Sequence, residues 1–197
     1  MINDKFVILG FLIQLGGLLI YVKETLAGRA KPNRVSWFLW FLAPMIAFAA
    51  ELDKGVGLQA LMTFSVGFGP AMVLLASFYS KKAYWKLKTT DYLCGLLSLL
   101  GLALWLIFNQ GNLAIALSIA ADLAAGAPTL VKSYYHPETE SAAAYTVAIV
   151  NSGITLLTIK VWSLANYGFP IYIFIINITF VILIKYKFGL RLQTSVK

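Results

Sequence analysis

Charged residues are scarce in this chain: they make up 12% of its 197 residues, whereas soluble domains usually carry about 25%. Hydrophobic residues make up 60%. A soluble globule of this length would need far more charge to cover its surface, which excludes that class of protein. The composition predicts an integral membrane protein with the lipid bilayer as its solvent.

Cysteine and histidine are nearly absent, with Cys94 and His136 as the only examples. One cysteine excludes an internal disulfide, and because Cys94 lies in an apolar run we expect it to be a small buried hydrophobe. His136 has no cysteine or second histidine nearby, which excludes a metal site with a usual set of ligands. We expect its side chain to be solvated.

Catalytic constellations are missing as well. The chain has no histidine–acid pair, no serine–histidine set, no paired carboxylates in an apolar segment and no phosphate-binding glycine loop. Its net charge is +8, but no soluble basic patch with interleaved aromatic residues is there to bind nucleic acid. We therefore predict a protein that is not an enzyme, with no cofactor, no metal and no nucleic acid as partner.

The chain does have seven apolar segments, each near the length of about 20 residues that crosses a bilayer as a helix. They are residues 6–22, 35–50, 57–79, 92–108, 112–131, 142–159 and 168–184. The first segment has no basic leader and no Ala-x-Ala-type cleavage site, so we expect a retained helix rather than a signal peptide. The sequence predicts an all-α membrane protein with seven transmembrane helices.

The basic residues lie mostly in alternate loops. Thirteen of the 16 are predicted on one side of the membrane: Lys23, Arg29, Lys31, Arg34, Lys81, Lys82, Lys86, Lys88, Lys132, Lys185, Lys187, Arg191 and Lys197. The other side holds Lys5, Lys54 and Lys160. Because positive loops stay in the cytoplasm, we place the N-terminus outside and the C-terminus in the cytoplasm, in a multi-pass protein of the plasma (inner) membrane.

An internal repeat relates the two ends of the chain. An offset of 108 residues pairs Gln14 with Asp122, Trp37 with Tyr145, and Ala43 with Asn151. A single extra helix between two three-helix units restores the orientation of the second unit, so that both insert in parallel. We predict a first three-helix repeat in residues 1–80, a linker loop and fourth helix in 81–110, and a second repeat with a short basic C-terminal tail in 111–197.

Two motifs of the second repeat, Pro128-Thr129 and the Pro-x-x-Glu-Ser of residues 137–141, accompany this 3+1+3 layout. Together they make the chain resemble the PQ-loop, SWEET and SemiSWEET superfamily of small transporters. The resemblance implies transport of a small polar metabolite, such as a sugar, an amino acid or a vitamin precursor, by alternating access. It also implies that the two units rock about prolines.

The resemblance extends to two pocket positions. SWEET-type carriers use an asparagine of the last helix, a position that Asn177 matches, while the expected amide of the third helix would fall near Pro70. The Trp-x-x-Trp of Trp37 and Trp40 is similar to one in vitamin-precursor carriers of the nicotinamide riboside type. Both features imply a solute pocket between the repeats.

Asp122 is the one acid inside an apolar segment. A carboxylate at the middle of a membrane costs about 3 kcal/mol on insertion scales, so it must face a cavity or a partner. We predict that Asp122 couples transport to protons and belongs to the substrate site, with Gln14 as its neutral counterpart. The alternative is an interhelical hydrogen bond, for example to Ser118 or Thr146, that serves packing alone.

Uncharged side chains complete the predicted site. The amides of Asn151 and Asn177 can donate to and accept from a polar solute. Trp37 and Trp40 share one helix face and can form an aromatic wall. The alternatives are interhelical hydrogen bonds for the amides and interfacial anchoring for the tryptophans. The predicted substrate-binding residues are Gln14, Trp37, Trp40, Asp122, Tyr145, Asn151 and Asn177.

Prolines and glycines within the apolar segments predict hinges, because a proline removes a backbone donor and bends its helix. The predicted hinge or gate residues are Pro44, Gly69, Pro70, Gly126 and Pro128. The alternative is that membrane helices simply contain more of both residue types. At the cytoplasmic side we expect Glu138 or Glu140 to close the protein through a salt bridge to Lys31 or Arg34.

Two alternatives to a monomeric transporter stay open. The first is a non-transporting membrane receptor or scaffold on the same fold, and the second is a homo-oligomer. A retinal-type receptor is excluded, because segment 168–184 has no lysine before Lys185 at its end. The partners that we predict are the lipid bilayer and a small polar solute.

Overall fold

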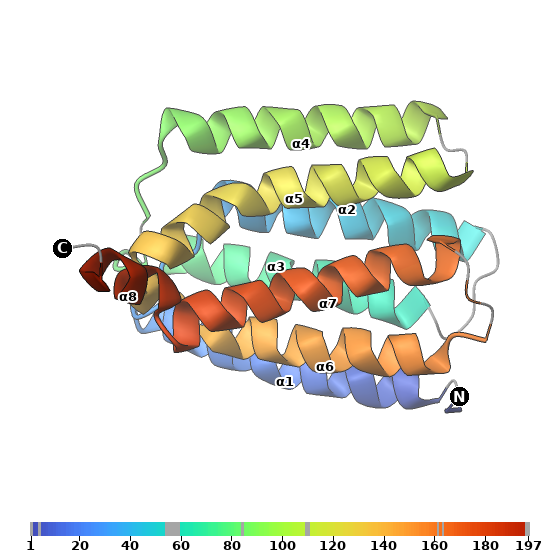
Figure 1. Ribbon diagram of the computed structural model, residues 1–197, viewed down its shortest axis with the longest axis horizontal. Helices are drawn as coiled ribbons and strands as arrows, with labels where there is room; N and C mark the ends of the chain where they lie inside the picture. The colour runs from blue at the N-terminus through green and yellow to red at the C-terminus, as the bar shows by residue number, and fades with distance from the viewer. Residues whose placement is uncertain are drawn as a thin grey trace.

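The structure is a computed structural model that describes residues 2, 3, 5–53, 60–83, 85–108, 111–160, 162 and 164–195; at some positions within these ranges only the backbone is described. The described residues form helices and no β-strand, which confirms the all-α prediction. The long helices are α1 (Phe6–Leu26), α2 (Arg34–Asp53), α3 (Ala60–Tyr79), α4 (Thr89–Phe108), α5 (Gly111–Tyr135), α6 (Ala142–Thr158) and α7 (Leu164–Lys185), shown in Figure 1. A 3-10 turn, η1 (Pro137–Thr139), and a short helix, α8 (Phe188–Ser195), complete them.

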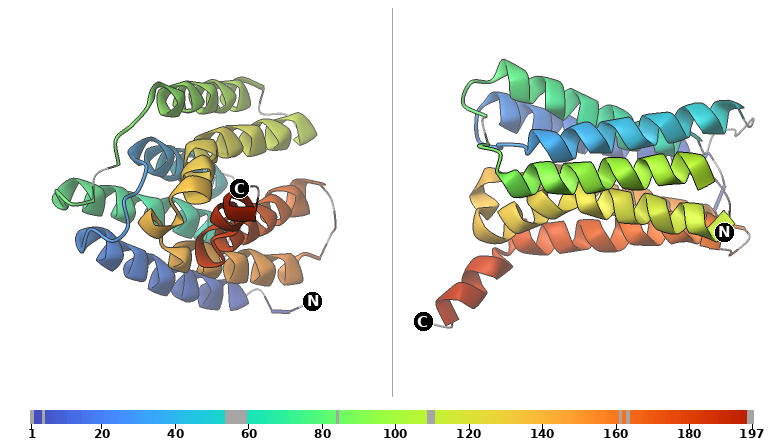
Figure 2. Two further views of the ribbon diagram at one scale, coloured as in Figure 1. Left: turned by 60° about the vertical axis from the view of Figure 1, so that its left-hand side comes forward. Right: turned by 90° about the horizontal axis from the view of Figure 1, so that it is seen from above.

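Each predicted apolar segment corresponds to one long helix within the described ranges. The C-terminal tail differs from the prediction, because α8 folds there as an additional helix. Lys187 separates it from α7 with a φ of 52°, a left-handed conformation that ends a helix and redirects the chain. Figure 2 shows α8 pointing away from the bundle.

Among the described residues, two helices are long and apolar enough to cross a membrane by length and composition: Phe6–Leu26 and Leu61–Tyr79. Ala142–Thr158 and Pro170–Lys185 are also apolar but shorter. These findings agree with membrane association of the chain. The seven-span arrangement and its orientation stay predictions.

Six helices form a closed ring. Helix α3 packs against α1 and α2, and α7 packs in the same way against α5 and α6. The two halves meet where α1 packs on α6 and where α2 packs on α5. Helices α1, α3, α5 and α7 run in one direction and α2, α4 and α6 in the other (Figure 1), so corresponding helices of the two halves are parallel. Helix α4 packs on α2 and α5 from outside the ring.

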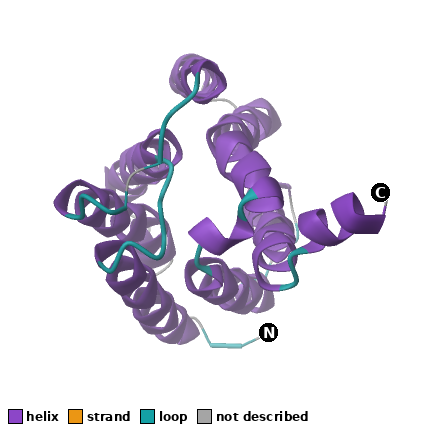
Figure 3. Ribbon diagram, turned by 90° about the vertical axis from the view of Figure 1, so that its left-hand side faces the viewer, coloured by secondary structure: helices purple, strands orange, loops and turns teal. Residues whose placement is uncertain are grey.

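The connections 27–33 and 136–141 and the described residues 80–83 and 85–88 lie together with α8 at one end of the bundle, which we call the basic end (Figure 3). Polar caps start the helices there. The Asn33 Oδ1 accepts hydrogen bonds from the backbone N–H groups of Val35 (3.1 Å) and Ser36 (3.3 Å) at the start of α2. The Ser141 Oγ accepts one from Ala143 at the start of α6. These caps fix where the polypeptide turns back into the bundle.

Candidate functional site

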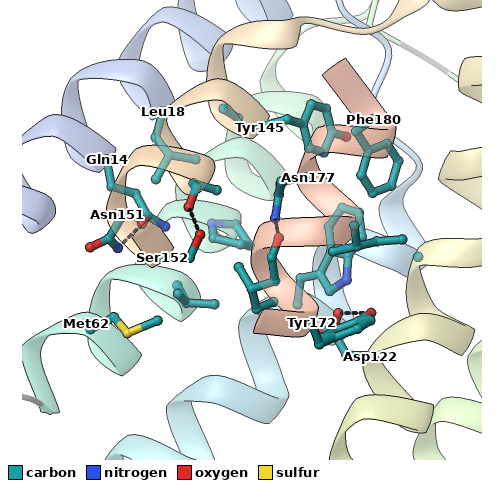
Figure 4. Close-up of a pocket in the computed structure, with 18 of the residues that line it drawn as sticks. Gln14, Leu18, Met62, Asp122, Tyr145, Asn151, Ser152, Tyr172, Asn177 and Phe180 are labelled. Carbon is teal, nitrogen blue, oxygen red and sulfur yellow. Dashed lines mark hydrogen bonds between the residues drawn. The ribbon is translucent and has the colours of Figure 1, made fainter. Parts of the chain in front are cut away.

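A cavity of about 80 Å³ lies inside the ring, with walls from all six of its helices (Figure 4). Room for several water molecules makes it large enough for part or all of a small solute. Its lining residues are Gln14, Leu18, Trp37, Trp40, Met62, Val66, Pro70, Asp122, Gly126, Ala144, Tyr145, Ala148, Asn151, Ser152, Tyr172, Ile173, Ile176, Asn177 and Phe180.

All seven residues predicted to bind substrate line this one cavity, although they come from five different helices. Two of the predicted hinge residues, Pro70 and Gly126, line it as well. Pro44, Gly69 and Pro128 lie in the helices around it. The structure thus brings the predicted site together, while the roles of its members stay predictions.

Asp122 has its partner on the neighbouring helix α7. The Tyr172 hydroxyl donates to the Asp122 Oδ2 over 2.8 Å (Figure 4). Of the two hydroxyls expected as alternatives, that of Thr146 donates instead to the Ala142 carbonyl of its own helix, over 2.9 Å. The side chain of Ser118 lies outside the described residues. A carboxylate can accept about four hydrogen bonds, so Asp122 keeps the capacity to bind a further donor.

A second polar group, the Gln14–Asn151 amide pair, joins α1 to α6 across the interface between the halves. The Asn151 Nδ2 donates to the Gln14 Oε1, and lies 3.4 Å from the Ser65 Oγ on α3. Gly10 allows this approach, because a side chain there would collide with the Asn151 amide. In Figure 4 this pair lies well apart from Asp122 and Tyr172. The cavity therefore has an amide pole and a carboxylate pole.

Other polar groups of the lining bond within their own helices. The Asn177 Nδ2 donates to the Ile173 carbonyl over 2.8 Å, and the Ser152 Oγ donates to the Ala148 carbonyl over 2.7 Å. Each bond occupies one donor of its side chain at little cost to the helix, and the Asn177 amide keeps a second N–H. The Asn177 Oδ1 is left as an acceptor near the middle of α7.

Aromatic side chains form the wall of the cavity toward the basic end. The ring centroids of Tyr145 and Phe180 are 4.3 Å apart in a stacked pair. Those of Trp37 and Trp40 are 5.4 Å apart, and the Trp40 ring is 6.0 Å from that of Phe180, both edge to face. Tyr21 continues the layer, 4.7 Å from Trp37. Such contacts add to the area that these rings bury and make the wall rigid.

A buried ionic network closes the bundle behind this aromatic layer. The Lys132 Nζ lies 2.6 Å from the Glu140 Oε1, and both side chains are at most 1% exposed. The Tyr21 hydroxyl and the Tyr145 hydroxyl (3.3 Å) both donate to the Glu140 Oε2, and Lys132 also donates to the Lys31 carbonyl. The network thus joins α1, α5 and α6 with the α1–α2 connection. Because Tyr145 also lines the cavity, it links the two sites.

The expected partners of the loop acids were wrong. Glu140 pairs with Lys132 instead of Lys31 or Arg34, because Lys132 lies in the last turns of α5 and points into the bundle. Arg34 donates to Ser77 instead, through Nη2 to the carbonyl (2.6 Å) and through Nε to Oγ (3.2 Å). Glu138 lies 3.6 Å from the Nδ1 of His136, with both side chains more than half exposed.

The helices continue through the predicted hinge residues. Pro44, Pro70 and Pro128 lie inside α2, α3 and α5, and Pro170 lies likewise inside α7. Helix α5 changes direction in its second half (Figure 1). Beyond Pro128, the Thr129 hydroxyl donates to the Ser36 Oγ over 2.9 Å and ties α5 to α2.

Glycines bring neighbouring helices close around the cavity. A Cβ on Gly126 would lie 3.2 Å from the Trp40 ring, and one on Gly69 would overlap with Leu18. Sequence reasoning treated these glycines as hinges. The structure shows that both make room for a large side chain of another helix.

Three important side chains were missed or misjudged. Tyr172 and Phe180 are aromatic residues in an apolar segment, where nothing in the sequence separates a site residue from a lipid-facing one. Lys132 was predicted to lie in a loop, whereas it lies in the last turn of α5. The described residues include no group of three His, Cys, Asp or Glu side chains that could hold a metal ion.

Comparisons of the chain with models of protein families, with curated proteins and with solved structures give no match.

Proposed function

We propose that the chain is a multi-pass membrane transporter that moves a small polar solute by alternating access of its two three-helix halves. The 3+1+3 fold of the PQ-loop, SWEET and SemiSWEET superfamily is the proposed fold class. The observation that carries the proposal is the cavity at the interface of the halves, with a carboxylate pole, an amide pole and an aromatic wall. Solute sites of transporters built from repeats lie at such interfaces.

The outer surface of the bundle supports its placement in a bilayer. Large apolar side chains are exposed on several helices, among them Leu12, Leu75, Leu97, Ile107 and Leu157. Apolar surface of this extent on a monomer marks contact with lipid or with another protein. Lys and Arg concentrated at the basic end would place that end in the cytoplasm.

The position of the ionic network supports alternating access. It lies between the cavity and the basic end, and it joins groups from both halves: Tyr21 and the Lys31 carbonyl from the first, Lys132, Glu140 and Tyr145 from the second. In this proposal, the arrangement with the network formed is the state closed toward the cytoplasm. Opening toward the cytoplasm requires these bonds to break, which makes the network the inner gate.

Accessibility of a single thiol tests this proposal. Ser152→Cys, made in a Cys94→Ala background, places a thiol in the cavity wall. A membrane-impermeant methanethiosulfonate should label it faster from outside than from the cytoplasmic side. Adding Glu140→Gln should weaken the inner gate and shift labelling toward the cytoplasmic side. Adding Glu138→Gln instead, which changes an exposed acid two residues away, should leave the pattern unchanged.

A receptor or scaffold would behave differently. Labelling from one side only, unaffected by Glu140→Gln in a folded protein, would overturn alternating access. Solute counterflow in liposomes at several pH values gives a second readout, in which Asp122→Asn should remove any response to pH. A pH response that survives this change would remove Asp122 as the coupling group.

A further inference from the structure

The described lining of the cavity carries negative charge and no positive charge. Asp122 is the only Asp, Glu, Lys, Arg or His among its described lining residues. The buried cation of the ionic network, Lys132, is bound by Glu140 and by the Lys31 carbonyl and is not among the lining residues. An anionic ligand would therefore lie beside a carboxylate without any cation to offset it. Such an arrangement rejects anions through electrostatic repulsion at short range.

The hydrogen-bonding groups point the same way. Tyr172 donates to Asp122, and Asn177 and Ser152 donate to carbonyls of their own helices. The carboxylate of Asp122 and the Asn177 Oδ1 keep unused acceptor capacity. At the carboxylate pole, the wall thus offers acceptors to a ligand that brings N–H donors, while the Trp37 Nε1 is a donor of the lining without a partner.

An aromatic ring lies close to the carboxylate pole. Gly126 is four residues after Asp122, so the two lie on one face of α5, one turn apart. The Trp40 ring packs on Gly126, and a Cβ added to this glycine would lie 3.2 Å from the ring. Cations are attracted to the faces of tryptophan rings, and the alkyl part of a ligand packs well against them. Trp40 therefore suits a cationic ligand held by Asp122.

We propose that the solute of this cavity is a small primary ammonium ion that lacks a carboxylate, bound through its N–H groups to Asp122 and packed against Trp40. The amide pole of Gln14 and Asn151, on the other side of the cavity, suits a neutral polar group such as a hydroxyl at the far end of the same molecule. A zwitterionic amino acid is excluded by its carboxylate. This assignment rests on the proposed function, which makes the cavity the solute site.

Four probes of nearly equal size test the assignment: 4-amino-1-butanol, 1,4-butanediol, 4-hydroxybutyrate and 4-aminobutyrate. Their affinities are measured by ligand-dependent thermal shift of the purified full chain in detergent. The amino alcohol should bind about 10-fold to 100-fold more tightly than the diol, the gain expected from charge-assisted hydrogen bonds. The two carboxylates should bind more weakly than the diol.

Variants show whether Asp122 is responsible. Asp122→Asn should reduce the preference for the amino alcohol over the diol to within about threefold, which is below 1 kcal/mol. Glu138→Gln, the matched loss of an acid outside the cavity, should keep the preference. Trp40→Leu should weaken binding of the amino alcohol more than binding of the diol. If the tryptophan contributed only to the shape of the cavity, binding of both compounds would weaken equally.

The outcomes separate this assignment from the proposed function. Equal affinities for the amino alcohol and the diol, tighter binding of either carboxylate, or an unchanged preference in folded Asp122→Asn would overturn the ammonium assignment. Transport of another solute could then still be found by counterflow in liposomes. Binding of the amino alcohol that depends on Asp122, without counterflow of that compound, would keep the assignment and overturn transport.

Discussion

Asp122 and Glu140 are two carboxylates inside the helix bundle with opposite surroundings: Glu140 is buried, whereas Asp122 is partly exposed to the cavity. Glu140 receives hydrogen bonds from Lys132, Tyr21 and Tyr145, and its charge is paired. Asp122 accepts a hydrogen bond from Tyr172 and faces a cavity without a cation among its described lining residues. A carboxylate whose acceptor sites are filled holds structure together. One whose sites are unfilled is available to a ligand, at a cost in stability when the ligand is absent.

Glu140→Ala should have the largest effect on stability. It leaves Lys132 buried without its carboxylate, and breaking a buried pair in this way costs about 3–5 kcal/mol. Unfolding of the purified protein in detergent, followed by circular dichroism, measures the loss. A loss below about 1 kcal/mol, typical of an exposed ion pair, would show that the network is solvated and would remove its role as a gate.

Asp122→Asn should separate stability from binding. The asparagine oxygen can still accept from Tyr172, and the cost of burying a charge disappears, so the free energy of unfolding without ligand should stay equal or rise by about 1 kcal/mol. Affinity for the amino alcohol should fall by the factor of about 10 to 100 given above. A loss of stability as large as that of Glu140→Ala would show that both carboxylates stabilise the fold, and that Asp122 serves helix packing rather than ligand binding.

Two tyrosine variants sharpen the comparison at a smaller scale. Tyr145→Phe and Tyr172→Phe each remove one hydroxyl that donates to a carboxylate, a change worth about 1 kcal/mol or somewhat more. Tyr145→Phe should lower stability and increase labelling from the cytoplasmic side, because its hydroxyl donates to Glu140 in the proposed gate. Tyr172→Phe should leave labelling unchanged and alter affinity for the amino alcohol. If Tyr172→Phe increased labelling from the cytoplasmic side and Tyr145→Phe altered only the affinity, the proposed division between gate and solute site would be wrong.

Glu138→Gln should have the smallest effect. Its partner His136 is exposed, and surface pairs of this kind contribute between about 0 and 1 kcal/mol. The same unfolding measurement should show a change within about 0.5 kcal/mol. A larger change would mean that the connection 136–141 is more tightly packed than its exposure indicates.

The sequence predicted the helices well because long apolar runs leave the backbone few alternatives in a low-dielectric medium. It missed α8, which is short and lies in a basic stretch without a long apolar run. The positions of polar residues in apolar segments predicted which side chains would line the cavity, because Gln14, Asp122 and Asn151 each need a polar partner inside the bundle. Their pairing was not predictable, because Gln14 was aligned with Asp122 by the repeat but bonds to Asn151 in space.

The ionic network around Glu140 shows a second limit of inference from sequence. The repeat suggested that the acids of one loop would meet the bases of the matching loop. The partner proved to be Lys132, eight residues before Glu140 in the same half. A tight turn over η1 returns the chain toward α5, and this local geometry decides the pairing. Matching loops by a repeat reveals which regions correspond, but not which side chains are buried.

The position of α4 outside the ring has a consequence for how the chain assembles. No helix of one half passes between helices of the other, so α1 to α3 can complete their mutual packing before the second half has been synthesised. Helix α4 then adds to α2 and offers a surface for α5. The ring closes last, when α6 reaches α1 and the Gln14–Asn151 bond forms. A substitution at Gly10, where that closure needs close contact, should therefore slow the final step of folding while the first half forms normally.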